Sequence, residues 1–252
     1  MDSTRPATCR ILVINGKGGC GKTTIATNLA VAYANRGHSV ALIDNDPQAS
    51  SSYWIEQRSP ALPTIRLIAA HQRPSMYQTQ VYSNRLPPEV DRIIVDGQSN
   101  ARDQEMESLL KQADIVLIPM LPSSIDIRAG GRFITNLLTH RAFRSSPRPV
   151  GVIANRIQPN TETHAKLEHF LGCIDVPAVA TFRDSPVYSE AIELGQGVVD
   201  MTESRAARKE TPAWWSLLRW IDAQRAPRSA SDLRRRPLAA GPARLDDRSI
   251  SA

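Results

Sequence analysis

A run of eight residues with four glycines, 16-GKGGCGKT-23, constrains this chain more than any other part of its 252 residues. It follows a short apolar run, 11-ILVIN-15, and it precedes a helical pattern over residues 22–36. Glycines let the backbone curl until its N–H groups point into one small space, and a following helix adds the positive end of its dipole. The sequence therefore predicts a strand, an anion-binding loop and a helix in direct succession.

Six further short apolar runs cover residues 39–44, 64–69, 92–96, 114–119, 150–155 and 178–182, and most of them are rich in Val and Ile and continuous rather than alternating. Continuous runs are typical of parallel strands that are covered on both faces. Helical patterns separate many of them, at about 22–36, 102–112, 127–140, 161–171 and 187–195, and Gly37 suits a left-handed cap. This alternation predicts an α/β fold, a three-layer sandwich with a mostly parallel central sheet.

A last helix is predicted over residues 212–225, where Trp214, Leu217, Leu218 and Ile221 form a core-facing stripe. The three tryptophans of this segment also fit a helix that lies on a membrane surface. After residue 226 the chain is rich in Pro, Ala, Ser and Arg, and it has too few large apolar groups to offset ordering entropy. The prediction is one domain over 1–226 and a basic, disordered tail over 227–252.

The net charge of +6 is unevenly distributed, because residues 201–252 hold eleven Lys and Arg against six Asp and Glu. A basic C-terminal part favours an anionic partner, either nucleic acid or a lipid surface, although a solvated tail without a partner fits too. The three cysteines form no CxxC pair, which favours a reducing cytoplasm. No run of about 18 apolar residues occurs, so we expect no membrane span.

The glycine-rich run matches the pattern GxxxxGK[ST], in which Lys22 reaches the β- and γ-phosphates of a nucleotide and the Thr23 hydroxyl binds Mg²⁺. Such a site also needs a carboxylate at the end of an apolar strand, and Asp96 is placed for it. Asp44 and Asp46 directly follow another strand, at the sheet edge where open α/β folds bind ligands. The sequence therefore predicts a P-loop nucleotide site with Mg²⁺.

Three segments, 17-KGGCGKTT-24, 43-IDNDPQAS-50 and 93-IIVDGQS-99, closely resemble the deviant-Walker P-loop ATPases of the ParA/MinD group. The resemblance covers about residues 10–225. It is nearest to the small ParF-like partition ATPases and to the ATPases that distribute carboxysomes. It implies the P-loop NTPase fold with a deviant Walker A motif, with ATP and Mg²⁺ as cofactors.

The resemblance implies roles by position. Lys17 matches the signature lysine that crosses to the partner subunit's ATP in a sandwich dimer, and Asp46 matches the aspartate that positions the hydrolytic water; with Lys22 they are the implied catalytic residues. The implied nucleotide-binding residues are Gly18, Gly19, Cys20, Gly21, Lys22, Thr23, Thr24 and Asn155, the last as a reader of adenine. The implied metal residues are Thr23, Asp44 and Asp96.

The function that the resemblance implies is a slow, partner-stimulated ATPase of the cytoplasm and nucleoid. It forms a homodimer on ATP binding, binds nonspecific DNA, and is released when a cargo-bound adaptor stimulates hydrolysis. The cargo can be a plasmid, a chromosome region or a carboxysome. Candidate DNA contacts are Arg183, Arg205, Arg208, Lys209 and Arg219, with residues 234–236 as an auxiliary.

Two alternatives remain open. A MinD-like membrane ATPase would end in an amphipathic helix, and the extreme C-terminus has little apolar surface for one. A metabolic P-loop enzyme, such as an amidoligase or an iron–sulfur reductase component, would need a second substrate site or cluster-bridging cysteines. The sequence shows no pattern for either of these features. The switch region also departs from many relatives, because 96-DGQS-99 replaces a DxPP-like segment.

Overall fold

The computed structural model describes residues 8–70 and 86–225. Seven strands form one sheet in the order β3-β2-β4-β1-β5-β6-β7, and every pairing is parallel. The strands are β1 Cys9–Val13, β2 Val40–Asp44, β3 Ile65–Ala69, β4 Arg92–Asp96, β5 Ile115–Met120, β6 Val150–Ile157 and β7 Ala178–Arg183. All seven predicted strands are confirmed.

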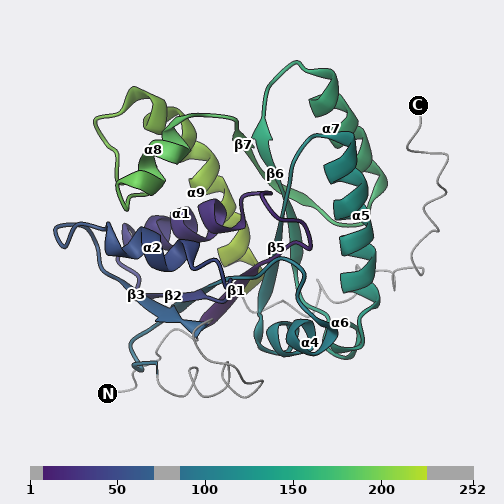
Figure 1. The fold of residues 1–252 in the computed structure, drawn as a ribbon, viewed down its shortest axis with the longest axis horizontal. Helices are drawn as coiled ribbons and strands as arrows, with labels where there is room; N and C mark the ends of the chain where they lie inside the picture. The colour runs from purple at the N-terminus through teal and green to yellow at the C-terminus, as the bar shows by residue number, and fades with distance from the viewer. Residues whose placement is uncertain (1–7, 71–85, 226–252) are drawn as a thin grey trace.

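Helices cover both faces of the sheet, so the three-layer prediction is confirmed (Figure 1). One layer contains α1 Lys22–Ala34, α2 Ser50–Glu56, α8 Val187–Glu193 and α9 Arg205–Arg225. The other layer contains α4 Asp103–Gln112, α5 Ser124–Thr139, α6 Arg141–Ser145 and α7 Glu162–Cys173. The predicted tail over 227–252, including residues 234–236, lies outside the described residues.

Parallel pairing brings the carboxyl ends of the central strands to a single edge of the sheet. β1 lies between β4 and β5, and β4 lies between β1 and β2. In the β2–β4 pair, Asp44 is the register partner of Asp96, so the last residues of two neighbouring strands are both aspartates. The glycine-rich loop leaves β1 at the same edge and leads into α1. This edge is therefore where the predicted site residues gather.

The last helix starts seven residues earlier than predicted, at Arg205, and it contains Pro212 in its interior. Proline removes one backbone donor and normally marks a helix start. Here the buried stripe continues before the proline through Ala207 and Glu210. The Glu210 carboxylate accepts hydrogen bonds from Arg183 Nε at 2.9 Å and from Tyr188 Oη at 3.3 Å. Tertiary contacts thus stabilise a helical turn that local preference disfavours.

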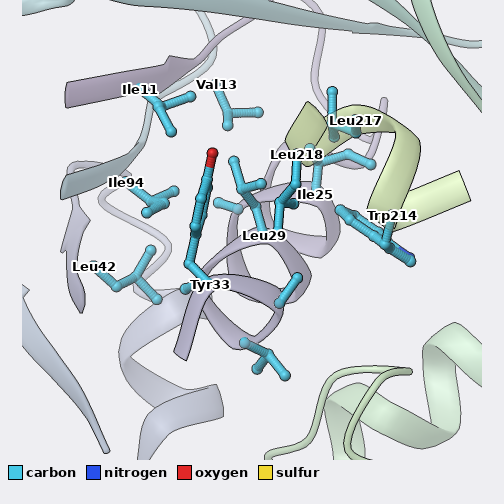
Figure 2. Close-up of a cluster of buried hydrophobic side chains, with 14 of the residues drawn as sticks. Ile11, Val13, Ile25, Leu29, Tyr33, Leu42, Ile94, Trp214, Leu217 and Leu218 are labelled. Atoms are coloured by element: carbon cyan, nitrogen blue, oxygen red, sulfur yellow. The ribbon is translucent and has the colours of Figure 1, made fainter. Parts of the chain in front are cut away.

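α1 is buried almost all round, and not on one side only as an amphipathic pattern would have it. It packs on the sheet through Leu29 and Tyr33, and α9 lies beside it in the same layer and contributes Leu217 and Leu218 to the shared core (Figure 2). Trp214 completes this core and stacks on Phe182, with ring centroids 4.1 Å apart. The predicted core-facing stripe of the last helix is therefore confirmed.

We expect Trp214→Ala to lower the free energy of unfolding by about 3–5 kcal/mol, because it leaves a cavity between α9 and Phe182. Urea unfolding followed by circular dichroism measures the change. Ser216→Ala, an exposed position on the same helix, is the matched control and should change stability by less than about 0.5 kcal/mol. Equal effects of the two substitutions would contradict the packing of Trp214 against Phe182.

Candidate nucleotide-binding site

The glycine-rich loop is folded as a cradle at the N-terminus of α1. Gly19 and Gly21 have φ angles of +76° and +91°, in the left-handed region that glycine tolerates. Gly21 directly precedes the helix and has no side chain to cap it, so the first N–H groups of α1 face the loop. The backbone thus presents donors and a positive dipole end at one point, as an anion site requires.

The Lys22 ammonium is nearly buried, with 6% of the residue exposed. It donates to the Ser99 hydroxyl at 2.6 Å and to the backbone carbonyl of Lys17 at 3.2 Å. Both acceptors are neutral oxygens, so the charge has no carboxylate partner among these contacts. A phosphate bound in the glycine-rich loop can therefore replace these oxygens as the hydrogen-bond and ion-pair partner of the Lys22 ammonium.

Asn155, near the end of β6, holds the glycine-rich loop by a hydrogen bond. Its amide nitrogen donates to the Cys20 carbonyl at 2.9 Å, and the residue is 5% exposed. A Cβ added at Gly21 would lie 2.2 Å from that nitrogen, so the amide and the glycine fit closely. The sequence did not predict this contact. The adenine-reading role of Asn155 stays a prediction.

Asp96 lies at the centre of the site and is fully buried. Its Oδ2 accepts hydrogen bonds from the hydroxyls of Thr23 and Ser51, both at 2.8 Å, while Oδ1 is buried without a hydrogen-bond partner. Burial is the largest influence on this carboxyl and raises its pKa to about 7. The unpartnered oxygen is therefore available to a cation or a water molecule.

Asp44 is also fully buried, next to Asp96 in the neighbouring strand. Its Oδ2 accepts the N–H and the hydroxyl of Ser52, at 2.8 and 2.7 Å, and its Oδ1 accepts the Asp46 N–H at 3.2 Å. The Asp46 carboxylate is partly exposed and accepts the Gln48 N–H at 3.0 Å. Asp44 thus orients the segment that carries the predicted catalytic aspartate.

The residues at this edge fit Mg²⁺. The ion prefers oxygen ligands and commonly takes few from the protein, completing its shell with phosphates and water. The Thr23 hydroxyl and the unpartnered Asp96 Oδ1 supply such oxygens beside the phosphate cradle. When bound, the ion would neutralise charge on the β- and γ-phosphates.

Lys17 lies at the front of the loop and is about one-third exposed. Its ammonium forms an ion pair with the Asp126 carboxylate at 2.5 Å, and Asp126 belongs to the first turn of α5. The Lys17 ammonium is therefore held by a carboxylate of the same chain. Its predicted role toward a partner's nucleotide requires this pair to open.

The five predicted DNA contacts lie close to one helix. Arg205, Arg208, Lys209 and Arg219 are exposed on α9, and their spacing brings them to one side of it. The Arg183 guanidinium donates to the Glu210 carboxylate and to the Lys209 carbonyl, so it adjoins the same helix from β7. The structure thus brings these cations together.

Sequence reasoning missed several polar residues of the site, namely Ser51, Ser52, Ser99 and Asp126. The three serines have no local signal, because serine is common in loops and helix starts. Asp126 follows Ser123 at the spacing of an N-terminal cap, and its N–H does donate to the Ser123 hydroxyl at 3.2 Å. That pattern predicts a helix start, but it says nothing of Lys17.

The fold and this site define a P-loop nucleotide-binding protein. A family model, "CobQ/CobB/MinD/ParA nucleotide binding domain", matches residues 11–198, and the chain belongs to this family. The general reaction that the family supports is ATP hydrolysis. The structure of one homologue, the septum site-determining protein MinD of Pyrococcus horikoshii, contains Mg-ADP. It is 20% identical to this chain with a TM-score of 0.68, and the match covers 86% of this chain and 96% of that one.

Among curated relatives, the maintenance of carboxysome distribution protein A of Halothiobacillus neapolitanus is 29% identical over 207 residues, which cover 79% of this chain and 91% of that protein. Protein ParA of Rhizobium radiobacter is 24% identical, over 76% of this chain and 85% of its own. The solved structure of Cyanothece apo McdA has a TM-score of 0.67 at 19% identity, covering 84% of this chain and 99% of that one. The resemblance to the ParA/MinD group is confirmed.

None of the helices within residues 8–70 and 86–225 is both long and apolar enough to cross a bilayer.

We expect the protein without nucleotide and Mg²⁺ to lose stability as the pH rises from about 4.5 to 7.5, in part through Asp96. Its folded pKa, about 7, lies above its ordinary value of 3.8, so the folded state binds more protons in this window. The free energy of unfolding of the native chain minus that of Asp96→Asn should therefore fall as the pH rises, measured by urea titration.

Asp184→Asn is the control, because the Arg156 guanidinium holds the pKa of Asp184 below its ordinary value. Its difference from the native chain should stay flat over the same window. A flat difference for Asp96→Asn would show that this carboxyl ionises normally despite its burial.

Proposed function

We propose that this protein is a positioning ATPase that forms an ATP-sandwich dimer, binds nonspecific DNA and is released by adaptor-stimulated hydrolysis. Its cargo would be a plasmid, a chromosome region or a protein organelle such as the carboxysome, and it would act in the cytoplasm on the nucleoid. The observation that carries the proposal is the loop with two lysines in different settings. The Lys22 ammonium is buried and donates to the backbone of the loop, whereas the Lys17 side chain is about one-third exposed and pairs with Asp126.

The position of Lys17 supports the proposed dimer. Its ammonium is one-third exposed, and it is held by one carboxylate at the rim of the site. A second subunit that brings ATP phosphates to this rim offers a stronger anionic partner than Asp126 does, because triphosphate carries more charge. The Lys17 side chain would then release Asp126 and neutralise charge on the partner's nucleotide.

DNA binding is supported by the basic side of α9. Nonspecific binding needs only phosphate neutralisation by Lys and Arg, and four such residues line the exposed side of a single helix. Lys209 and Arg205 have no opposing carboxylate within the ion pairs of the described residues. These cations are thus available to phosphates.

The alternative of a MinD-like membrane ATPase rested mainly on the three tryptophans of the last helix, and their positions in α9 do not support it. Trp214 is fully buried, and Trp215 and Trp220 are half-buried against the same core. The Arg36 guanidinium lies 4.8 Å from the Trp215 ring, and the Trp220 ring would lie 3.0 Å from a Cβ added at Gly151. The tryptophans pack inward, so this helix offers few apolar groups to a bilayer.

We expect Lys17→Ala to retain ATP binding but to lose the ATP-dependent dimer and to hydrolyse ATP at least about 100-fold more slowly, because a charge that acts only on the partner's phosphates is lost. Light scattering coupled to size exclusion measures the dimer, and phosphate release measures hydrolysis. Asp46→Ala should keep the dimer while losing hydrolysis, and Lys111→Ala, at the far end of α4, should change neither. A normal dimer in Lys17→Ala would contradict the sandwich.

We expect DNA binding to require ATP and to weaken roughly ten-fold or more in Arg205→Glu/Arg208→Glu, with the slope of log affinity against log salt reduced by about 2. Fluorescence anisotropy with a random duplex measures both quantities. The control is Arg66→Glu/Arg144→Glu, which changes the same net charge at exposed sites away from α9. Equal losses in the two variants would place DNA elsewhere, and equal binding without nucleotide would contradict the coupling to ATP.

A further inference from the structure

Three consecutive serines open α2, directly after the segment that carries Asp46. Ser50 is exposed, whereas Ser51 and Ser52 are buried, with 0% and 8% of their surface accessible. Burying a hydroxyl is costly unless it finds a hydrogen-bond partner. The two buried serines therefore need partners, and the exposed one does not.

Each buried hydroxyl binds a different carboxylate of the nucleotide site. The Ser51 hydroxyl donates to Asp96 Oδ2 at 2.8 Å, and the Ser52 hydroxyl donates to Asp44 Oδ2 at 2.7 Å. These aspartates end two adjacent strands and are register partners. One helical turn thus contacts both buried acids of the sheet edge.

We propose that Ser51 and Ser52 are positioning residues of the Mg²⁺–nucleotide site, which fix the two carboxylates in the orientation that serves the metal and the hydrolytic aspartate. The inference rests on the proposed ATPase function and adds two residues to it. Ser51 acts on the metal through Asp96, and Ser52 acts on Asp46 through Asp44.

The chemistry of the donors supports this role. A hydroxyl holds a carboxylate oxygen in place but carries no charge, so the negative charge of the acid is kept for a cation. With Thr23 and Ser51 both on Oδ2, Asp96 leaves its other oxygen, Oδ1, without a partner. Hydrogen bonds that hold a metal-binding side chain in place typically contribute 10- to 100-fold to metal affinity.

Ser52 is connected through Asp44 to the backbone of Asp46. Asp44 accepts the Ser52 hydroxyl on Oδ2 and the Asp46 N–H on Oδ1. Ala49, between Asp46 and the helix, has a φ of +56°, in a region that alanine rarely adopts. The turn from β2 into α2 therefore has an uncommon backbone conformation, and Asp44 connects its two ends by accepting hydrogen bonds from Asp46 and Ser52.

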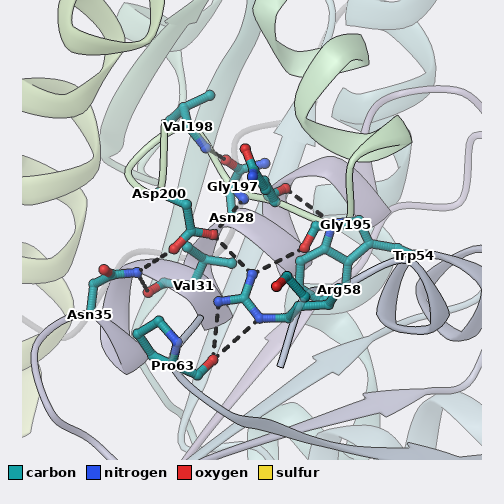
Figure 3. A network of polar contacts seen from close by, with 12 residues as sticks. Asn28, Val31, Asn35, Trp54, Arg58, Pro63, Gly195, Gly197, Val198 and Asp200 are labelled. Carbon is teal, nitrogen blue, oxygen red and sulfur yellow. Dashed lines mark hydrogen bonds and ion pairs between the residues drawn. The ribbon is translucent and has the colours of Figure 1, made fainter. Parts of the chain in front are cut away.

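Polar contacts anchor the C-terminal end of α2 to the loop between α8 and α9 (Figure 3). Trp54 Nε1 donates to the Gln196 carbonyl at 3.0 Å. Arg58, just after the helix, donates to the Asp200 carboxylate at 2.9 Å and to the Gly195 carbonyl at 3.1 Å, and both charged side chains are almost completely buried. The two ends of α2 are thus held by separate sets of contacts.

The test for Ser51 is the Mg²⁺ dependence of nucleotide binding. A fluorescent ATP analogue reports binding in EDTA and over a Mg²⁺ titration, for the native chain, Ser51→Ala and the matched control Ser50→Ala. We expect Ser51→Ala to raise the half-saturating Mg²⁺ concentration about ten-fold or more and to change binding in EDTA by less than about two-fold. Ser50→Ala should behave as the native chain, and thermal melts show that each variant is folded.

The test for Ser52 is the separation of kcat from KM. We expect Ser52→Ala to lower kcat about ten-fold or more with little change in the KM for ATP, since it displaces Asp46 and leaves the phosphate cradle intact. An unchanged Mg²⁺ dependence in Ser51→Ala, or an equal loss of binding with and without the metal, would overturn the role of Ser51. A change in KM alone would overturn that of Ser52.

The native chain separates this inference from the function on which it rests. If it shows no Mg²⁺-dependent nucleotide binding, the proposed ATPase function fails and this inference fails with it. If it binds and hydrolyses ATP with Mg²⁺ while Ser51→Ala and Ser52→Ala match it, only the positioning roles are overturned.

Discussion

The pairing of Asp44 with Asp96 at the end of two parallel strands is the constraint on which the rest of the site depends. Two carboxylates that are fully buried side by side are costly unless each is hydrogen-bonded or met by a cation. The fold supplies neutral donors from the first turns of α1 and α2, and it leaves Asp96 Oδ1 unpartnered. This arrangement holds both carboxylates in place and keeps one oxygen of Asp96 for a cation such as Mg²⁺.

This constraint also organises the surrounding helices. α1 is fixed to the acid pair by Thr23 and enclosed by the sheet and α9, while α2 is fixed to it by serines and anchored at its far end to the loop before α9. The predicted nucleotide-binding residues of α1 and the basic side of α9 therefore belong to one packed layer.

Much of this was predictable from sequence, and the exceptions share a cause. The strands, the loop and the residues Lys22, Thr23 and Asp96 follow from local patterns, because each motif fixes its own strand, loop and helix. The start of α9 was missed because Glu210 is stabilised by Arg183 and Tyr188, from other elements. α2 was missed because its buried positions are mostly serines, which no hydrophobic periodicity reveals. The pairing of Lys17 with Asp126 joins segments that are remote in the chain.

The sequence by itself determined the class of the protein: a glycine-rich loop between a buried strand and a helix can bind phosphate wherever it folds, since its donors are backbone groups and its charge is its own lysine. Only the tertiary structure decided which side chains complete the site. The strand order set Asp44 beside Asp96, and the docking of α2 brought Ser51 and Ser52 to them. Those contacts depend on burial and on register between distant segments, and neither is written in any local stretch of the chain.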